Sequence, residues 1–471
     1  MFEKLFKLSA NKTTVRTEIV AGITTFMAMA YILAVNPLIL GDAGMPKGGV
    51  LIATAIAAFI GTMLMAFLAN YPFALAAGMG LNAYFAYTVV LQMGYSWQFA
   101  LLAVFVEGLL FLALSLTPVR EGIFNAIPFS LKKAVSVGIG LFITLIALKT
   151  AGVLVDDGAT LVALVKFSKV PLHTVGITAL LALVGTILTA LMVVKNWKGS
   201  ILLGIIVTWI LGIICEACGL YTPDPAAGFF STYPNFSLGA IADNFKEFGT
   251  LCGALFTSGG WTHTVDGNVA GSGWALVKSL DFIVVMFAFF FVDLFDTLGT
   301  LIGVSMKAGF LDEKGKLPRI SGALYADSIA TSVGAVLGTS TTTTFVESAA
   351  GVSAGGRTGL TAVTTAVLFL LSIILSPLFL SIPGFATTPA LVIVGFMMMG
   401  AVTSIDFNDA SEAVPAFLAI IAMPFFYSIS EGIMFGVISY TLINLLAGKA
   451  KKIHWIMYIL TVLFIAKYAL M

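Results

Sequence analysis

The chain has 471 residues, of which 59% are hydrophobic and only 10% charged, whereas soluble domains carry about 25% charged residues. This composition excludes a water-soluble protein and indicates a chain that crosses a membrane many times. The net charge of +1 gives no electrostatic field that would favour nucleic acid as a partner.

Apolar runs of a length suited to membrane crossing recur along the whole chain. A helix needs about 20 apolar residues to cross a bilayer, and most of the runs come close to this length. We therefore predict an all-α polytopic membrane protein with about fourteen spans, followed by a hydrophobic tail at 453–470. The runs cover residues 17–40, 49–69, 73–93, 98–117, 130–150, 174–194, 200–218, 281–305, 320–338, 345–355, 359–381, 387–403, 412–428 and 430–447.

Basic residues precede the first run and follow the last of the fourteen. Cytoplasmic loops of membrane proteins carry an excess of Lys and Arg, so we expect a multi-pass protein of the cell (cytoplasmic) membrane with both ends in the cytoplasm. We expect no signal peptide, because the first residues lack an apolar core with a small-residue cleavage site. The basic residues are Lys4, Lys7, Lys12, Arg16, Lys449, Lys451 and Lys452.

The polar interval 216–278 divides the runs into two sets of seven. Two short sequence likenesses occur in the same order in both sets: 56–61 resembles 329–334, and 200–206 resembles 432–438. An odd number of spans in each set makes the two halves inverted repeats, an arrangement that is common in secondary transporters.

Asp293 and Asp296 lie inside the run 281–305, three residues apart and therefore on one helical face. An ionisable group at the bilayer centre costs about 3 kcal/mol or more and usually marks a transport pathway. We expect both acids to face protein interior or water. The alternative is that one of them only caps a broken helix or pairs with a neighbour for packing.

A threonine run before Glu347, Thr341 to Thr344, favours extended backbone over helix. Extended backbone at membrane depth is tolerated only where it is buried or lines a cavity, so we predict a broken span at a binding site. The small residues from Ser348 to Gly351 allow a half-helix to begin there. The alternative is a re-entrant loop with a structural purpose only.

The matching place in the first half is the run 73–93, which Pro72, Gly78 and Gly80 interrupt. We place Asn82 at the position that corresponds to Glu347. Its amide offers two donors and an acceptor for the edge of a ligand, although a buried Asn satisfied by nearby backbone is nearly as favoured.

Two broken spans that face each other, with carboxylates from a third span, suit a small, flat, polar solute. Phe345, Phe26 or Tyr84 would flank its faces. The chain has no nucleotide-cradling glycine motif and no His or Cys spacing typical of a metal site. We therefore expect no cofactor, and transport driven by an ion gradient.

Four segments in order resemble the azaguanine-type purine permease branch of the nucleobase:cation symporter (xanthine/uracil permease) family. The likeness runs over nearly the whole chain. These segments are Thr17–Pro37, Gly78–Tyr84, Val292–Thr300 and Thr341–Gly359.

The resemblance implies a 7+7 inverted repeat with a core (transport) domain and a gate domain, homodimers formed through the gate domains, and short antiparallel strands that break spans 3 and 10. By this likeness the core is 1–117 and 281–381, the gate is 130–218 and 387–447, a linker covers 219–280, and a basic stretch and hydrophobic tail cover 448–471.

An Asp in a low-dielectric site can take up a coupling proton, so the proton-coupling residues are expected to be Asp293 and Asp296, either of which could carry the proton. The resemblance also implies which side chains bind substrate. Relatives that carry uracil or xanthine have Glu in span 8 where this chain has Asp293. The substrate-binding residues are Glu347, Asp293, Asn82, Phe345, Phe26 and Thr25.

The predicted function is that of a proton-coupled symporter, not an enzyme, that imports purine nucleobases such as hypoxanthine, guanine or adenine across the inner membrane by alternating access. Its expected partners are the nucleobase, membrane lipid and a second copy of the chain, and the ion remains H⁺ or Na⁺. One rival is an anion transporter or channel of the same architecture, which a carboxylate at Glu347 disfavours. The other is an intramembrane enzyme using Asp293 and Asp296, which their place on one helix disfavours.

Overall fold

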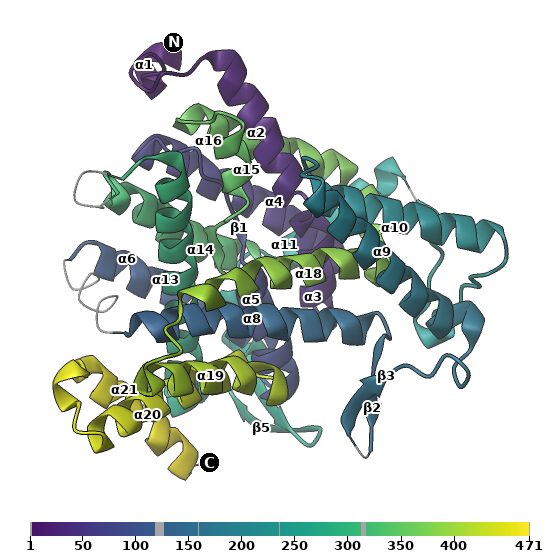
Figure 1. Ribbon diagram of the computed structural model, residues 1–471. Coiled ribbons are helices and arrows are strands. Elements are labelled where there is room, and N and C mark those ends of the chain that lie inside the picture. Colours follow the sequence, from purple (N-terminus) through teal and green to yellow (C-terminus); the bar gives the residue numbers. More distant parts are fainter. Residues whose placement is uncertain (1, 118–126, 159, 235, 312–316, 471) are drawn as a thin grey trace.

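The computed structural model is a large helical mass with one short pair of strands near its middle (Figure 1). Within the described residues, 11 helices are long and apolar enough to cross a membrane. The other three predicted crossings fall on the two broken segments and on a shorter apolar helix, Ala410–Phe425. The described residues are 2–117, 127–158, 160–234, 236–311 and 317–470.

One group of helices packs around α4 and α14. Small residues permit this close approach, because a Cβ added at Gly61 of α4 would lie 2.7 Å from the Cβ of Ala330 on α14. The members are α1 (Phe2–Phe6), α2 (Val15–Met29), α3 (Ile32–Asp42), α4 (Lys47–Leu64), α6 (Trp97–Ser115), α13 (Leu280–Ala308), α14 (Ile320–Leu337), α16 (Gly359–Leu371) and α17 (Ser376–Leu380).

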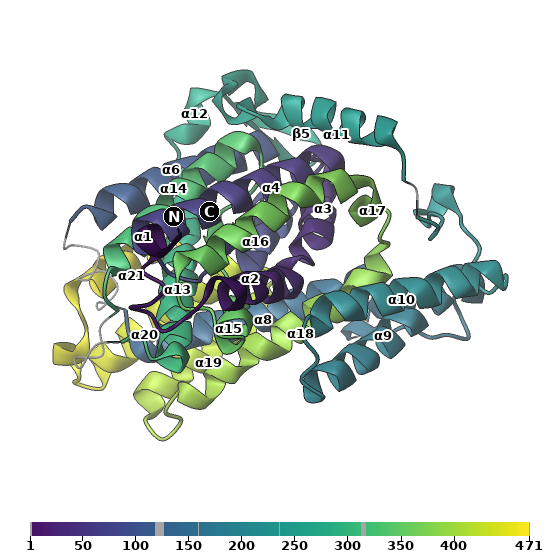
Figure 2. The same ribbon diagram turned by 90° about the horizontal axis from the view of Figure 1, so that it is seen from above.

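A second group packs around α8 and α18. Helices α9 and α10 of this group project away from the rest of the molecule (Figure 2). We propose that the two groups are the core and gate domains. The members are α8 (Phe129–Thr150), α9 (Ile177–Val194), α10 (Ser200–Ala217), α18 (Gly384–Met399), α19 (Ala410–Phe425), α20 (Ile429–Leu446) and α21 (Trp455–Leu470).

Two strands from distant parts of the chain pair where the sequence predicts broken spans. Strand β1 is Leu75–Ala77 and β6 is Thr342–Thr344; they are antiparallel, and Ala76 lies opposite Thr343. Each strand is followed by a short helix. These helices are α5 (Met79–Ala83), continued by the π-helical segment Tyr84–Gln92, and α15 (Ser348–Ser353). A π-helical turn at Met65–Ala69 precedes β1.

Two β-hairpins lie outside the apolar runs, in addition to the strands at the broken spans. At the tip of the second hairpin, Asp266 and Gly267 both have positive φ; an Asp-Gly pair of this kind is a strong hairpin signal that the analysis of the sequence did not use. The elements are β2 (Leu154–Asp157), β3 (Leu161–Leu164), β4 (Thr262–Val265), β5 (Asn268–Ser272), α11 (Leu238–Leu251) and α12 (Trp274–Val277).

The hydrophobic tail forms α21, which runs back along α20. The Thr461 hydroxyl donates to the Thr441 hydroxyl at 2.8 Å, and the Tyr468 hydroxyl donates to the Glu431 carboxylate at the start of α20. The C-terminus therefore lies away from the N-terminus (Figure 1).

Short 3-10 and π-helical turns complete the described structure. They join or extend the longer helices. They are Leu172–Gly176, Pro225–Ala227, Ala254–Phe256, Ser258–Gly260, Ser372–Leu375, Gly400–Ser404 and Ala450–Lys452.

Candidate functional site

The two broken spans meet where β1 pairs with β6, and we call this point the crossing. The extended backbone at the crossing is hydrogen-bonded within the protein. Beyond the paired strands, the N–H of Gly78 donates to the carbonyl of Thr341 and the N–H of Phe345 donates to the carbonyl of Ala74, each at 3.0 Å. All six strand residues are buried. This meets the condition that irregular backbone at membrane depth must be satisfied within the protein.

Hydroxyl groups replace a third strand at the outer edges of this pair. Thr62 of α4 accepts from the N–H of Leu75 at 2.9 Å and donates to the Leu75 carbonyl at 3.2 Å. On the other edge, Thr331 of α14 donates to the Thr342 carbonyl at 3.0 Å. The crossing therefore depends on side chains of the two helices that flank it.

Glu347 is the N-cap residue of α15, directly beyond the crossing. Its carboxylate accepts a hydrogen bond from the hydroxyl of Tyr31 at 2.8 Å, and Tyr31 lies at the break between α2 and α3. Asp296 of α13 is within electrostatic range of Glu347, and both residues are partly exposed. Two acids and one phenol thus converge where a polar ligand can reach them.

An open space adjoins these acids along one face of α13. Asp296 is followed on this face by Gly299 and Gly303, both of which are exposed. A Cβ added at either glycine would meet nothing within 4 Å. Val346, next to Glu347, is 50% exposed. Asp296 and Glu347 therefore lie beside an exposed stretch of the protein.

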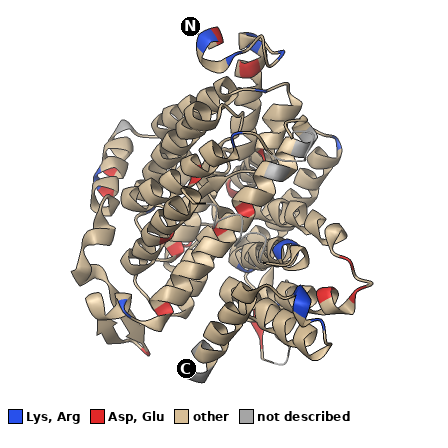
Figure 3. Cartoon of the chain, turned by 90° about the vertical axis from the view of Figure 1, so that its left-hand side faces the viewer, with Lys and Arg blue, Asp and Glu red and all other residues tan. Residues whose placement is uncertain are grey.

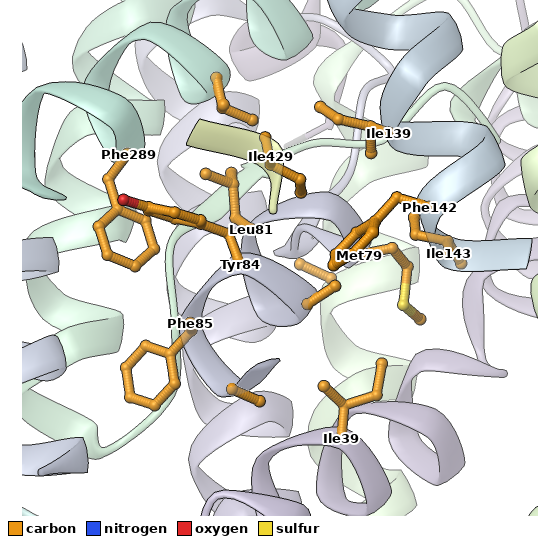
Figure 4. Packing of buried hydrophobic residues seen from close by; sticks show 14 of the residues in the cluster. Ile39, Met79, Leu81, Tyr84, Phe85, Ile139, Phe142, Ile143, Phe289 and Ile429 are labelled. Carbon is orange, nitrogen blue, oxygen red and sulfur yellow. The ribbon is translucent and has the colours of Figure 1, made fainter. Parts of the chain in front are cut away.

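An apolar layer closes the other side of the site. The helix that follows β1 starts beside Asp296, because a Cβ added at Gly78 would lie 3.9 Å from the Asp296 carboxylate. The same helix continues through Leu81 and Tyr84. It ends at a polar cavity of about 320 Å³ that is lined by Gln92 and other polar residues. Between these ends, Tyr84 packs on Phe289 with ring centroids 4.7 Å apart. Figure 4 shows this layer, which also contains Ile139, Phe142 and Ile429.

The structure brings some of the predicted binding residues to this space and places others elsewhere. Glu347 and Asp296 meet there, whereas Asp293 is fully buried among other acids. Thr25 is also fully buried and donates to the Ala21 carbonyl at 3.1 Å. These positions leave Asp293 and Thr25 without access to the open space.

The predicted aromatic residues lie close to the site without enclosing it. Phe345 is buried directly beyond β6, with 6% of its surface exposed. Phe26 is partly exposed and packs edge-on against Phe369, with ring centroids 5.2 Å apart. One ring is therefore buried and the other partly exposed beside the site.

Asn82 does not occupy the position equivalent to Glu347, and the proposed correspondence is wrong. The N-cap of α5 is Gly78, whereas the N-cap of α15 is Glu347. Asn82 is fully buried; its amide N–H donates to the Ala77 carbonyl at 3.4 Å, and its carbonyl accepts from the Ser340 hydroxyl. The polar groups of the Asn82 side chain thus form hydrogen bonds with residues at the crossing itself.

Three residues at or near the site were missed by the analysis of the sequence. Tyr31 gave no signal, because one tyrosine in an apolar run is unremarkable. Glu107 and Asp327 are lone acids within the runs 98–117 and 320–338, and the criterion that identified Asp293 could have found them. Figure 3 shows acidic positions in the middle of the helical mass.

Comparison with known proteins gives a match along most of the chain. A model of the permease family matches residues 16–435. The guanine/hypoxanthine permease PbuO of Bacillus subtilis is 42% identical over 464 residues, which cover 98% of each chain. The adenine permease AdeP of Escherichia coli is 40% identical over 469 residues, covering 99% of this chain and 96% of AdeP.

Solved structures share the fold at low sequence identity. SLC26A9 aligns with a TM-score of 0.62 at 11% identity, covering 93% of this chain and 67% of that protein. The transmembrane domain of the cyanobacterial bicarbonate transporter BicA aligns with a TM-score of 0.60 at 13% identity, covering 89% of this chain and 97% of that domain. The predicted fold class, an inverted-repeat membrane transporter with two broken spans, is confirmed.

Proposed function

The chain belongs to the permease family, and from this premise we propose that it is a proton-coupled symporter that imports purine nucleobases such as hypoxanthine, guanine or adenine by alternating access. The resemblance predicted from four sequence segments is confirmed by the family match and the relatives. The relatives are permeases, so the prediction that the chain is not an enzyme is confirmed as well.

The observation that carries the proposal is the partly exposed pair of acids at the crossing of the broken spans. A purine base presents ring N–H groups, and a carboxylate at Glu347 is an acceptor for them. The Tyr31 hydroxyl holds one oxygen of Glu347 at 2.8 Å, which leaves the second oxygen for the ligand. Phe345 and Phe26 are the rings that can lie over its faces after rotation.

Asp296 and Asp293 are the proposed proton-coupling residues. Asp296 is partly exposed beside the open space, and Asp293 is one turn away on the same helix and fully buried. A proton that enters at Asp296 therefore has a short path to an interior carboxyl. Na⁺ in place of H⁺ is the alternative that the transport test distinguishes.

We propose alternating access because one side of the site is open and the other side is closed by an apolar layer. The acids adjoin open space along α13, whereas the layer around Tyr84 and Phe289 separates them from the polar cavity at Gln92. Movement of the core against the gate would open that layer and close the other side. We further propose a homodimer through the gate domains in the cytoplasmic membrane, with the N-terminus and the basic stretch 449–452 in the cytoplasm.

An anion transporter of the same fold remains the second candidate, because BicA is described as a bicarbonate transporter. A fold that is shared at 13% identity does not indicate which substrate is transported. The carboxylates of Glu347 and Asp296 repel an anion, and the salt bridges in the described residues all lie away from this site. The acid pair therefore favours a neutral base.

The test is uptake of labelled hypoxanthine into proteoliposomes, with adenine, guanine, xanthine and uracil as competitors and with or without an uncoupler. Glu347→Gln removes a charge-assisted hydrogen bond worth about 1.5–3 kcal/mol, so we expect the apparent affinity to fall about 10- to 100-fold. Asp406→Asn, at an exposed turn, is the matched control.

Two results would contradict the proposal. Unaltered uptake by Glu347→Gln would remove Glu347 from the binding site. Saturable bicarbonate uptake without any purine uptake by the unaltered protein would favour the anion transporter. Loss of accumulation on uncoupling supports H⁺, whereas dependence on a Na⁺ gradient would replace H⁺ with Na⁺.

A further inference from the structure

A second group of acids lies inside the core, away from the open space. Glu107 of α6, Asp293 of α13 and Asp327 of α14 are each 0% exposed, and α6 packs against both α13 and α14. We call these three residues the buried triad. Three carboxyl groups on three helices, with no exposed surface, require a specific account, because buried charge is costly unless it is compensated.

The hydrogen bonds of the buried triad are incomplete. Thr297 and Thr344 donate to one oxygen of Asp327, at 2.9 and 3.1 Å, and the other oxygen has no partner. The carboxyl of Glu107 faces that of Asp293, yet neither oxygen of Glu107 has a donor. Two carboxyl groups in contact form a hydrogen bond only when one of them holds a proton.

No positive charge compensates the buried triad in the described part of the chain. The ion pairs there involve Lys149, Lys246, Lys449 and Lys452, each with at least 41% of its side chain exposed. The charged group that also acts on the triad is another acid, Asp296. Buried carboxyl groups that act on one another without a nearby cation cannot all be ionised. Bound protons must therefore neutralise part of the negative charge of the triad.

A metal ion is a poorer fit than a proton. Among the described residues, no group of three or more His, Cys, Asp or Glu is arranged to hold a metal ion. A bound cation would also need several oxygens directed at one point. The oxygens of Glu107 and Asp327 that have no hydrogen-bond partner can instead be protonated.

The buried triad is linked to the substrate site through β6. Thr297, which donates to Asp327, also lies 2.6 Å from the hydroxyl of Thr343, and Thr344 donates to the same oxygen of Asp327. These two β6 residues directly precede the segment Phe345 to Glu347. A row of hydroxyl groups therefore connects Asp327 with the strand that leads to Glu347.

We infer that the buried triad is the site that holds the coupling proton, with Glu107 and Asp327 as coupling residues in addition to Asp293. The proton enters from water by way of Asp296, adds to a carboxyl oxygen shared by Glu107 and Asp293, and leaves as H⁺ on the other side. One positive charge crosses with each base, and no covalent bond is changed at the end of the cycle. The inference rests on the proposed function and deepens it.

The first experiment compares exchange with accumulation in proteoliposomes. With a pH gradient of about one unit, a carrier that couples one proton to one base accumulates it up to about tenfold. We expect Glu107→Gln and Asp327→Asn to reduce this ratio to near one while hypoxanthine counterflow continues. Asp42→Asn, at an exposed acid at the end of α3, is the matched control and should accumulate normally.

A second measurement does not depend on transport. Infrared difference spectra of the purified protein should contain a band of a protonated carboxyl group that Glu107→Gln removes. Glu107→Asp, which keeps a carboxyl at this position, should retain part of the accumulation and of the band.

The outcomes separate this inference from the proposed function. If the unaltered protein exchanges no purine, the proposed function is wrong. If it exchanges and accumulates purine but Glu107→Gln accumulates equally well and keeps the carboxyl band, the proton site is elsewhere. Accumulation that follows Na⁺ alone would overturn the inference, because the buried triad would then not hold the coupling ion.

Discussion

The two half-spans that cross at the centre share a backbone plan and differ in chemistry. In the first half, the apolar strand Leu75–Ala77 leads through the single residue Gly78 into α5. In the second, the strand Thr342–Thr344 leads through Phe345, Val346 and Glu347 into α15. The second connection is longer, and it carries an aromatic ring and an acid.

This difference shows how an inverted repeat can divide its tasks. The first half-span leads into the apolar layer at Leu81 and Tyr84, which closes one side of the site. The second faces the buried triad with its threonine hydroxyls and the open space with Glu347. A symmetric backbone thus supports an asymmetric site, because backbone hydrogen bonds fix the fold and side chains supply the chemistry.

The largest expected effect comes from the edge of β1. Thr62→Val removes the partner of both the N–H and the C=O of Leu75, and each buried unpaired group costs about 1–3 kcal/mol. We expect the free energy of unfolding to fall by about 2–4 kcal/mol, seen as a lower thermal midpoint in detergent. Thr186→Val, whose hydroxyl bonds only within its own helix, is the control; equal midpoints would contradict the edge assignment.

A smaller effect is expected where the half-spans meet outside the paired strands. The hydroxyl of Ser348 accepts from the N–H of Ala74 at 3.0 Å. Ser348→Ala leaves one buried donor unpaired, a loss of about 1–2 kcal/mol, measured by the same thermal midpoint. Ser439→Ala, at a partly exposed hydroxyl that bonds only within its own helix, should change nothing. If the two variants behave alike, the crossing is held by the strands alone.

The smallest effect is expected at the edge of β6. Thr331→Val removes the hydroxyl that donates to the Thr342 carbonyl at 3.0 Å and, at the longer distance of 3.5 Å, to the Asp293 carboxylate, so the loss of stability should be about 1 kcal/mol. Thr331→Ser keeps the hydroxyl and should restore the midpoint. A loss as large as that of Thr62→Val would show that the two edges depend equally on their helices.

The sequence predicted the local breaks in the spans but not how they meet. Pro72 and the threonine run act within a few residues, so periodicity and propensity expose them. The register of Ala76 opposite Thr343 depends on contacts between distant segments, which no local pattern contains. The comparison of Asn82 with Glu347 failed because the two halves have connections of different length between strand and helix.

The site was predicted where one residue type is anomalous in its run. Asp296 and Glu347 are acids in apolar segments, and the structure places them together. Glu107 and Asp327 are equally anomalous, but each is a lone acid in its run, with no second acid or broken segment beside it. Tyr31 could not be predicted, since its role depends on the break between α2 and α3.

The pairing of β1 with β6 also constrains the order in which this chain can be built. Ala74 and Ser348, which hydrogen-bond at the crossing, are 274 residues apart in the sequence. Synthesis proceeds from the N-terminus at about 5–20 residues per second, so the first half-span is made well before its partner exists. Until β6 has been synthesised, the backbone of Leu75–Ala77 has no strand to pair with at membrane depth. Its N–H and C=O groups must then be hydrogen-bonded in another way, within the translocation machinery, by water or in a temporary helix.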